Sequence, residues 1–170
     1  MRSTPRRRRW VYWSLVLGLA LLWWLVAIPT ALAKENTVNY TLTDLQHRNF
    51  SHQNLVGTSF AGADMRWANF QGANLQSTIL TRGSFLEANL QDADLTDAFA
   101  DRVFFNEANL TYANFTNAIL TSSLFTDAVI TGADFSGAIL DRHQIAMMCE
   151  YAEGINPQTG VATRDSLGCR

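Results

Sequence analysis

Every fifth residue between positions 45 and 140 is a large apolar side chain, with one exception. The exception is Ala100, so nineteen of these twenty positions are large and apolar. A period of five matches neither the 3.6-residue period of an α-helix nor the two-residue period of a β-strand. A fixed period of this kind indicates a repeat architecture in which each unit stacks on the next. Eight of the ten phenylalanines occupy the register, and its aromatic core positions include Phe85, Phe105, Phe115, Phe125 and Phe135.

The residues that precede each apolar position are also restricted. We call the apolar position the centre of its pentapeptide. Two residues before the centre, twelve of twenty residues are Ala, and one residue before it, eleven of twenty are Asn or Asp. The centre is expected to fill an enclosed interior, with the Ala pointing inward at a corner where a larger side chain would collide. Asn and Asp tolerate tight turns and hydrogen-bond to nearby backbone, so they are expected on the outside.

This Ala-(Asp/Asn)-(Leu/Phe)-x-x pattern resembles the repeat of the pentapeptide-repeat family, and it covers residues 43–142 without an insertion. The resemblance implies an all-β fold, a right-handed quadrilateral parallel β-helix with one pentapeptide on each side and four in each coil. Twenty pentapeptides then form about five coils. At the ~4.8 Å spacing of paired strands, the rod is roughly 24 Å long.

Such a rod needs a cap at each end, because an open end exposes apolar interior and unpaired backbone groups. Residues 34–42 are expected to be a lead-in and N-terminal cap, since Val38, Tyr40 and Leu42 alternate as in a β-strand. Arg48 and Gln53 stand where Ala is expected at inward corners, so the first coil is predicted to be irregular.

Residues 143–170 are expected to form the C-terminal cap. Asp141 with Gln144 three residues later is a pattern typical of a helix start, and Gly154 marks the helix end. The sequence therefore predicts a short α-helical cap laid across the last coil. Its core-facing side would carry Ile145, Met148, Cys149 and Ala152.

Cys149 and Cys169 are the two cysteines of the chain. In an exported protein, thiols persist as disulfides, so we expect a Cys149–Cys169 bridge. Closing a loop of about twenty residues is worth ~3 kcal/mol in the chain-entropy model. Two free thiols are the alternative. A catalytic pair of Cys149 and His143 is disfavoured, because nothing nearby in the sequence forms an oxyanion site or an orienting acid.

The first 33 residues have the organisation of an export signal. Arg6 to Arg9 are followed by the uncharged apolar run from Trp10 to Ile28 and then by Ala31-Leu32-Ala33. Small residues at the last and third-last positions are what a signal peptidase accepts, so cleavage is predicted between Ala33 and Lys34. An uncleaved membrane anchor is the alternative, because about 20 apolar residues can span a bilayer. In either case, this segment is the only expected contact with a membrane.

The export signal limits the compartments in which the protein can lie, and the net charge limits the class of ligand that it can bind. The tail from Asn156 to Cys169, together with the signal and the cysteine pair, resembles that of the pentapeptide-repeat proteins of the thylakoid lumen in cyanobacteria and chloroplasts. The thylakoid lumen is therefore the expected location, and the periplasm is the alternative. Beyond residue 33, eight basic and fifteen acidic residues leave a net charge of −7. This charge disfavours nucleic acid as a direct ligand, because nucleic-acid binding is dominated by Lys and Arg on phosphates.

No constellation of catalytic residues stands out, so the chain is expected to be a non-enzymatic scaffold without a cofactor, a catalytic residue or a metal site. His47, His52 and Asp44 could hold a metal only if a further ligand joined them. Two other function classes stay open. One is an acidic solenoid that mimics DNA and acts on a topoisomerase, as some members of the resembled family do. The other is a metal-binding or enzymatic protein.

Large apolar residues replace Asn or Asp just before the centre on one side of the expected coil. They predict an interaction surface for an unidentified protein partner or for self-association. The alternative is that these side chains only cover the flank of the solenoid. The candidate surface comprises Ile79, Phe99, Ile119 and Ile139 on this side, Phe104 and Leu124 on the next side, and Arg82 and Arg102 as a charged margin.

The processing site can be tested directly. We expect the protein isolated after export to begin at Lys34, because the small residues of Ala31-Leu32-Ala33 follow the apolar run. N-terminal sequencing and intact mass measure the start of the chain. A full-length chain retained in the membrane would contradict cleavage and support the anchor.

Overall fold

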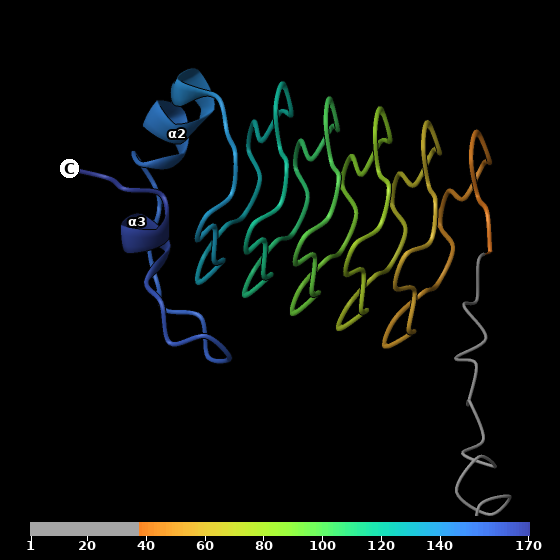
Figure 1. Cartoon of the computed structure of the whole chain (residues 1–170), viewed down its shortest axis with the longest axis horizontal. Coiled ribbons are helices and arrows are strands. Elements are labelled where there is room, and N and C mark those ends of the chain that lie inside the picture. Colours follow the sequence, from red (N-terminus) through yellow and green to blue (C-terminus); the bar gives the residue numbers. More distant parts are fainter. Residues whose placement is uncertain (1–37) are drawn as a thin grey trace, which may run out of the picture. The chain divides into compact units, whose positions relative to one another are not determined.

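The computed structural model describes residues 38–170, which form a four-sided solenoid closed at its C-terminal end by two short helices (Figure 1). The expected signal segment and its cleavage site between Ala33 and Lys34 lie outside the described residues. Within residues 38–170, no helix is both long enough and apolar enough to cross a membrane.

Parallel β-bridges between residues twenty apart set the register of the coils. The bridges on one side run from Asn39↔Ser59 to Ile119↔Ile139, so each coil contains four pentapeptides, as the spacing predicts. The β structure of the coils consists of isolated bridges, one on each side of a coil, and not of extended strands, and one antiparallel bridge, Ile155↔Ala162, lies in the C-terminal cap. The bridging residues of the coils stand in four ladders, which define four faces. Face A carries Asn39, Ser59, Ile79, Phe99, Ile119 and Ile139; face B carries Asp44, Asp64, Ser84, Phe104 and Leu124; face C carries Asn49, Asn69, Asn89, Asn109 and Val129; face D carries Asn54, Asn74, Asp94, Asn114 and Asp134.

A tight turn at every corner lets the chain change direction within five residues. The second residue after each centre, from Leu42 to Gly137, has a positive φ between 54° and 68°. Most of these residues are not glycine, although this conformation costs an ordinary residue free energy. At Gly132, glycine also leaves room for a large side chain of the preceding coil. A Cβ on Gly132 would lie 2.5 Å from Cε1 of Tyr112.

The centres fill the interior as the five-residue register predicts. Phe105 is fully buried and stacks on Phe85 and Phe125, with ring centroids 5.3 and 5.1 Å apart. Phe115 and Phe135 form a second stack, at 5.1 Å. The Ala residues two before the centre are buried from Ala63 to Ala133, because they fill the narrow space beside the large centres.

The exceptional Ala100 is compensated by its neighbours. The next inward corner carries Val103 instead of Ala, and this larger side chain is fully buried. The hydroxyl of Ser123, on the following coil, donates to the carbonyl oxygen of Ala100 at 2.6 Å and accepts from the backbone N–H of Val103 at 2.9 Å. The side-chain volume lost at Ala100 is thus regained at Val103, and the buried Ser123 hydroxyl satisfies the backbone groups between them.

The N-terminal end differs from the predicted lead-in. Residues 38–42 already follow the repeat, with a bridge at Asn39 and a turn at Leu42, so they do not form an alternating strand. Tyr40 occupies a centre and stacks on Phe60 at 5.1 Å, which explains its spacing five residues before the first predicted centre. Arg48 and Gln53 are exposed and do not point into the lumen as their positions suggested.

The C-terminal cap contains α2 (Arg142–Met148) and α3 (Thr163–Ser166), which Figure 1 shows beyond the last coil. Helix α2 starts one residue before the predicted cap boundary and ends well before Gly154. Helix α3 was not predicted from the sequence. Of the predicted core-facing residues, Met148 and Ala152 are buried, while Ile145 and Cys149 are half-buried.

The predicted capping box of α2 is not present, because its two side chains serve the solenoid. Asp141 makes no side-chain capping hydrogen bond. Its Oδ2 instead accepts from the backbone N–H of Ser122 at 2.7 Å, and Oε1 of Gln144 accepts from the N–H of Phe125 at 3.3 Å. These N–H groups belong to the last coil, where no further coil offers a carbonyl oxygen.

The tail that follows α2 supplies further acceptors to the unpaired N–H groups of the last coil, and a disulfide joins it to the residue after α2. The N–H of Phe135 donates to Oγ of Ser166 at 3.0 Å, and the N–H of Gly132 donates to the carbonyl oxygen of Glu153 at 2.8 Å. Cys149 and Cys169 form a disulfide, with Cα atoms 5.6 Å apart. The disulfide therefore holds residues 150–168 against the last coil.

Truncation of the central aromatic stack tests the register. Phe105→Ala should lower the free energy of unfolding by ~3 to 5 kcal/mol, because the residue is fully buried between two rings. Thr126→Ala is the control: its side chain is exposed and should change the stability by less than about 0.5 kcal/mol. Denaturant melts measure both. Equal losses in the two variants would overturn the assignment of inward and outward positions.

The disulfide should protect the cap more than the central coils. Reduction should release the tail first, because each coil of a solenoid is stabilised mainly by its neighbours. Hydrogen exchange with and without reductant should then show faster exchange at Gly132 and Phe135 than at Phe105. Two reactive thiols in the native, unreduced protein would contradict the bridge.

Candidate interaction surface

Faces C and D are polar, and their side chains hydrogen-bond within the solenoid. On face C, Nδ2 of Asn89 donates to Oδ1 of Asn69 at 3.3 Å, and Nδ2 of Asn109 donates to Oδ1 of Asn89 at 3.4 Å. On face D, Oδ1 of Asp94 accepts from the N–H and the hydroxyl of Thr96. Hydrogen-bonding groups on these faces are thus used within the solenoid itself.

Face A is apolar along its C-terminal part. Ile79 and Phe99 each keep 44% of their surface exposed and Ile139 keeps 55%, while Ile119 is half-buried. We call these four residues the apolar ladder. They occupy the position that carries Asn39 and Ser59 on the first coils of this face and mainly Asn or Asp on faces C and D, so the stacking of the coils does not require them to be apolar.

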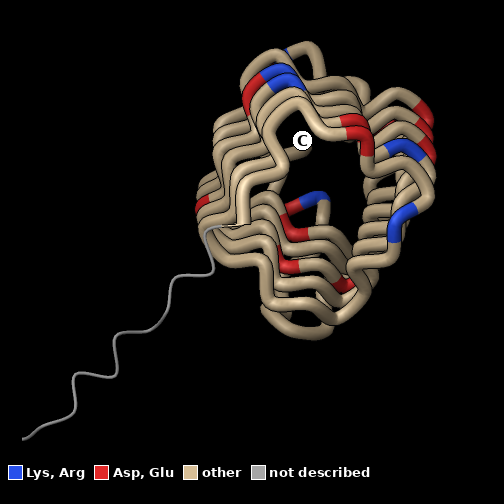
Figure 2. The backbone as a smooth tube through the Cα atoms, turned by 90° about the vertical axis from the view of Figure 1, so that its right-hand side faces the viewer, with Lys and Arg blue, Asp and Glu red and all other residues tan. Residues whose placement is uncertain are grey.

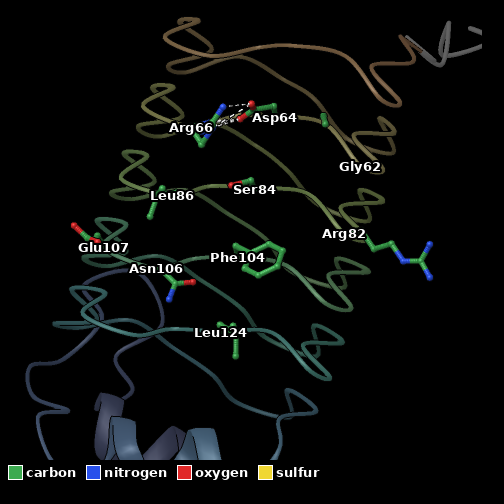
Figure 3. A pocket seen from close by; sticks show the side chains of 11 residues that line it. Gly62, Asp64, Arg66, Arg82, Ser84, Leu86, Phe104, Asn106, Glu107 and Leu124 are labelled. Atoms are coloured by element: carbon green, nitrogen blue, oxygen red, sulfur yellow. Dashed lines mark hydrogen bonds and ion pairs between the residues drawn. The ribbon is translucent and has the colours of Figure 1, made fainter.

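Face B contains a shallow groove of about 700 Å³. Its floor is formed by the face B ladder, in which Phe104 is 48% exposed and Leu124 is 37% exposed. Figure 3 shows Phe104 on the groove floor, with Ser84 on the coil before it and Leu124 on the coil after it. The groove thus has an apolar floor over two successive coils.

An ion pair lies at the N-terminal end of the groove. Nη2 of Arg66 donates to Oδ2 of Asp64 at 2.7 Å, and Nε of Arg66 donates to Oδ1 at 2.8 Å. The hydrogen bond from Arg66 holds the pKa of Asp64 below its usual value. The pair keeps both charges at the groove edge at neutral and mildly acidic pH. Glu107 lines the groove farther along.

Arginines mark the edge between faces A and B. Arg82 and Arg102 are both exposed at this edge, and Figure 2 shows charged residues placed mainly along the edges of the solenoid. Nε of Arg102 donates to Oδ2 of Asp101 at 2.8 Å, while the hydroxyl of Thr121 donates to Oδ1 at 2.6 Å. The Thr121 hydrogen bond is the largest cause that lowers the pKa of Asp101, and Arg102 adds to it.

The structure thus brings together all residues of the candidate surface predicted from the sequence, on two adjacent faces and their common edge. It adds the groove, which the sequence analysis missed. The spacing of Asp64 and Arg66 was the available signal, since residues on either side of a centre both point outward. The side chains of Leu86 and Asn106 also line the groove.

His47 and His52, which were considered as metal ligands, lie at different corners of the solenoid and contact other residues. His47 stacks on Trp67, with ring centroids 4.9 Å apart, and Arg66 lies 5.2 Å above the same indole ring. His52 lies over Gly72 at a different corner. Within residues 38–170, no three His, Cys, Asp or Glu side chains are grouped so that they could hold a metal ion.

Comparison with protein families matches the chain to the family described as pentapeptide repeats. Eight copies of the repeat cover residues 43–82, 88–127 and 108–142. These ranges include more than half of the chain and coincide with the solenoid. A search of curated proteins found no significant match.

Several solved structures are similar to the chain. A pentapeptide repeat protein from the thylakoid lumen of Arabidopsis thaliana is 39% identical, with 75% of this chain and 88% of that chain covered and a TM-score of 0.49. HetL, a pentapeptide repeat protein involved in heterocyst differentiation regulation from the cyanobacterium Nostoc sp. strain PCC 7120, is 25% identical. Its TM-score is 0.59, and the match covers 62% of this chain and half of HetL. The trypsin-treated plasmid-mediated fluoroquinolone resistance protein QnrB1 is 20% identical, with 66% and 64% of the two chains covered and a TM-score of 0.47.

Proposed function

Because the chain belongs to the pentapeptide-repeat family, whose members form right-handed quadrilateral β-helices, we propose that it is an exported scaffold that binds another protein through faces A and B. The binding surface consists of the apolar ladder, the face B groove and the arginine edge between them. No catalysis is part of this function.

The observation that carries the proposal is the difference between the faces. At the same structural position, faces C and D present mainly Asn and Asp, whereas faces A and B present Ile79, Phe99, Phe104, Leu124 and Ile139, each more than a third exposed. Exposed apolar residues are common singly, but a contiguous group with a charged rim is typical of a protein-binding surface. The repeat accepts Asn or Ser at these positions, so the fold alone does not account for the change.

The polar chemistry of the other faces supports a binding role over catalysis. Face C and D side chains are occupied in local turns; for example, Oδ1 of Asn109 accepts both the N–H and the hydroxyl of Thr111. A catalytic acid or base needs a free functional group beside a substrate pocket. The shallow groove offers an apolar floor, the internally paired carboxylate of Asp64 and the single further carboxylate of Glu107, which suits a protein segment.

The proposed location is the thylakoid lumen, with the periplasm as the alternative. It is supported by the signal-like segment in residues 1–33 and by the tail motif of residues 156–169. A disulfide between Cys149 and Cys169 is also suited to an oxidising compartment. Fractionation of the source cells, followed by immunoblotting of lumen and periplasm, distinguishes the two.

Substitution of the groove floor tests the function. We expect the double variant Phe104→Ser and Leu124→Ser to bind its partner about tenfold more weakly or worse, because large apolar side chains anchor protein interfaces. Ser84 shows that this ladder accepts serine, so the melting temperature should change little. Affinity capture of the partner from the exported fraction, followed by titration of the captured protein, measures the loss.

The matched control is Val129→Asn. Val129 is 49% exposed at the same ladder position on face C, where Asn109 precedes it by one coil. This control should leave both binding and melting unchanged. Capture that is equally strong with the groove variant and the control would exclude the groove, and a collapsed melt of the groove variant would show that its floor is structural.

A further inference from the structure

We infer that face A is a dimerisation face, and that its occupant is a second copy of this chain in parallel orientation. A two-fold axis parallel to the solenoid would pass through the middle of face A and relate the two copies. The inference rests on the proposed function, because it names the occupant of one half of the same surface. The groove on face B stays open for the other protein.

The spacing of the apolar ladder favours an identical solenoid as the occupant. Ile79, Phe99, Ile119 and Ile139 stand on four successive coils, bridged to one another through their backbones. Adjacent strands are ~4.8 Å apart, so a partner that contacts all four must repeat its own side chains at this spacing. A second copy provides this spacing at every coil, whereas a helix repeats every ~5.4 Å and loses the match over four coils, and an irregular loop has no fixed repeat. Closed two-fold pairing of one face with itself is the commonest form of homo-oligomer.

The charges at the two edges of face A fit the parallel arrangement. With the axis along the solenoid, the edge that carries Arg102 faces the other edge of the partner copy at the same coil. That other edge carries Asp97, two residues before Phe99, whereas Arg102 lies three residues after it. Each Arg102 therefore faces an Asp97 of the second copy, and the symmetry forms this pair twice.

Both side chains are available for this contact. Asp97 is exposed, and its carboxylate has no hydrogen-bond or ion-pair partner within residues 38–170. Arg102 is exposed and uses Nε for Asp101, while its terminal nitrogens make no hydrogen bond within the described residues. One coil earlier, Ser77 faces Arg82, and one coil later, Asn117 faces Ser122, so no like charges meet.

An antiparallel pair would fit less well. With the axis perpendicular to the solenoid, each edge of face A meets the same edge of the second copy. If Phe99 is placed opposite Ile119, Arg82 comes near Arg142, and Asp97 comes near the uncharged Asn117. The Asp97–Arg102 contact is then lost. Charge complementarity thus selects the parallel arrangement.

The association should be weak and depend on concentration. The ladder offers four side chains along one narrow face, which places the interface at the small end of specific protein contacts. Sedimentation velocity of the protein purified after export should show a monomer–dimer equilibrium that shifts with concentration. The double variant Phe99→Asn and Ile119→Asn should shift it about tenfold or more towards monomer, with Val129→Asn unchanged. A wild-type protein that is monomeric at all concentrations would overturn the inference.

Cross-linking tests the orientation. In a parallel pair, equivalent ladder residues meet, so Ile79→Cys and Ile139→Cys should each form a covalent homodimer under mild oxidation. An antiparallel pair can bring only one of these positions to its own copy, because they lie three coils apart, ~14 Å. Val129→Cys on face C is the control and should stay monomeric. Failure of either ladder variant to cross-link would exclude the parallel pair.

A charge exchange tests the edge contact. Asp97→Lys and Arg102→Glu should each weaken dimerisation, and the two together should restore it, because opposite charges then face each other again. No recovery in the double variant would remove this pair from the interface. The groove variant Phe104→Ser and Leu124→Ser should dimerise normally. Unchanged partner capture in the groove variant would contradict the proposed function alone, whereas a wild-type protein that captures its partner but stays monomeric would contradict the dimer alone.

Discussion

The structure depends on a lumen of constant width. Each side of each coil must place one large centre and one small corner residue inside it, and Phe105 with Ala108 shows this pairing in its regular form. The backbone hydrogen bonds to the next coil hold only if this width is kept, since the N–H of Phe105 reaches the carbonyl oxygen of Leu124 at 2.8 Å. Where Ala100 breaks the rule, Val103 and Ser123 restore the filling locally.

Because only the inward residues fill the lumen, the residues that stabilise the fold differ from those that form the binding surface. Interior packing uses two positions of every pentapeptide and leaves the residue just before the centre on the outside, where Asn, Ser, Ile and Phe all occur. Substitutions there change the surface at little cost to the lumen. A solenoid can therefore carry a polar ladder such as Asn69, Asn89 and Asn109 on one face and an apolar ladder on another.

The two ends do not share this freedom, because stacking stops there. At the C-terminal end, the unpaired N–H groups of the last coil take their acceptors from side chains of Asp141, Gln144 and Ser166. Residues that resemble a helix-capping pattern in the sequence are thereby drawn to the solenoid. At the other end, Tyr40 covers the lumen by stacking on Phe60. Each end is thus completed by contacts that no single repeat contains.

The sequence by itself determined the repeat, the inward residues and the order of the ladders, because a strict five-residue period assigns each side chain to the inside or outside without knowledge of distant residues. It also placed Ile79, Phe99 and Ile139 on one face, since residues twenty apart must stack. Only the tertiary structure decided the roles of Asp141 and Gln144, the place of Tyr40, and the groove between Arg66 and Phe104. These features arise where one coil meets another or meets the cap. The physical reason is that a five-residue period describes one pentapeptide at a time. It carries no information about which unpaired backbone group or which exposed side chain a distant part of the chain will contact.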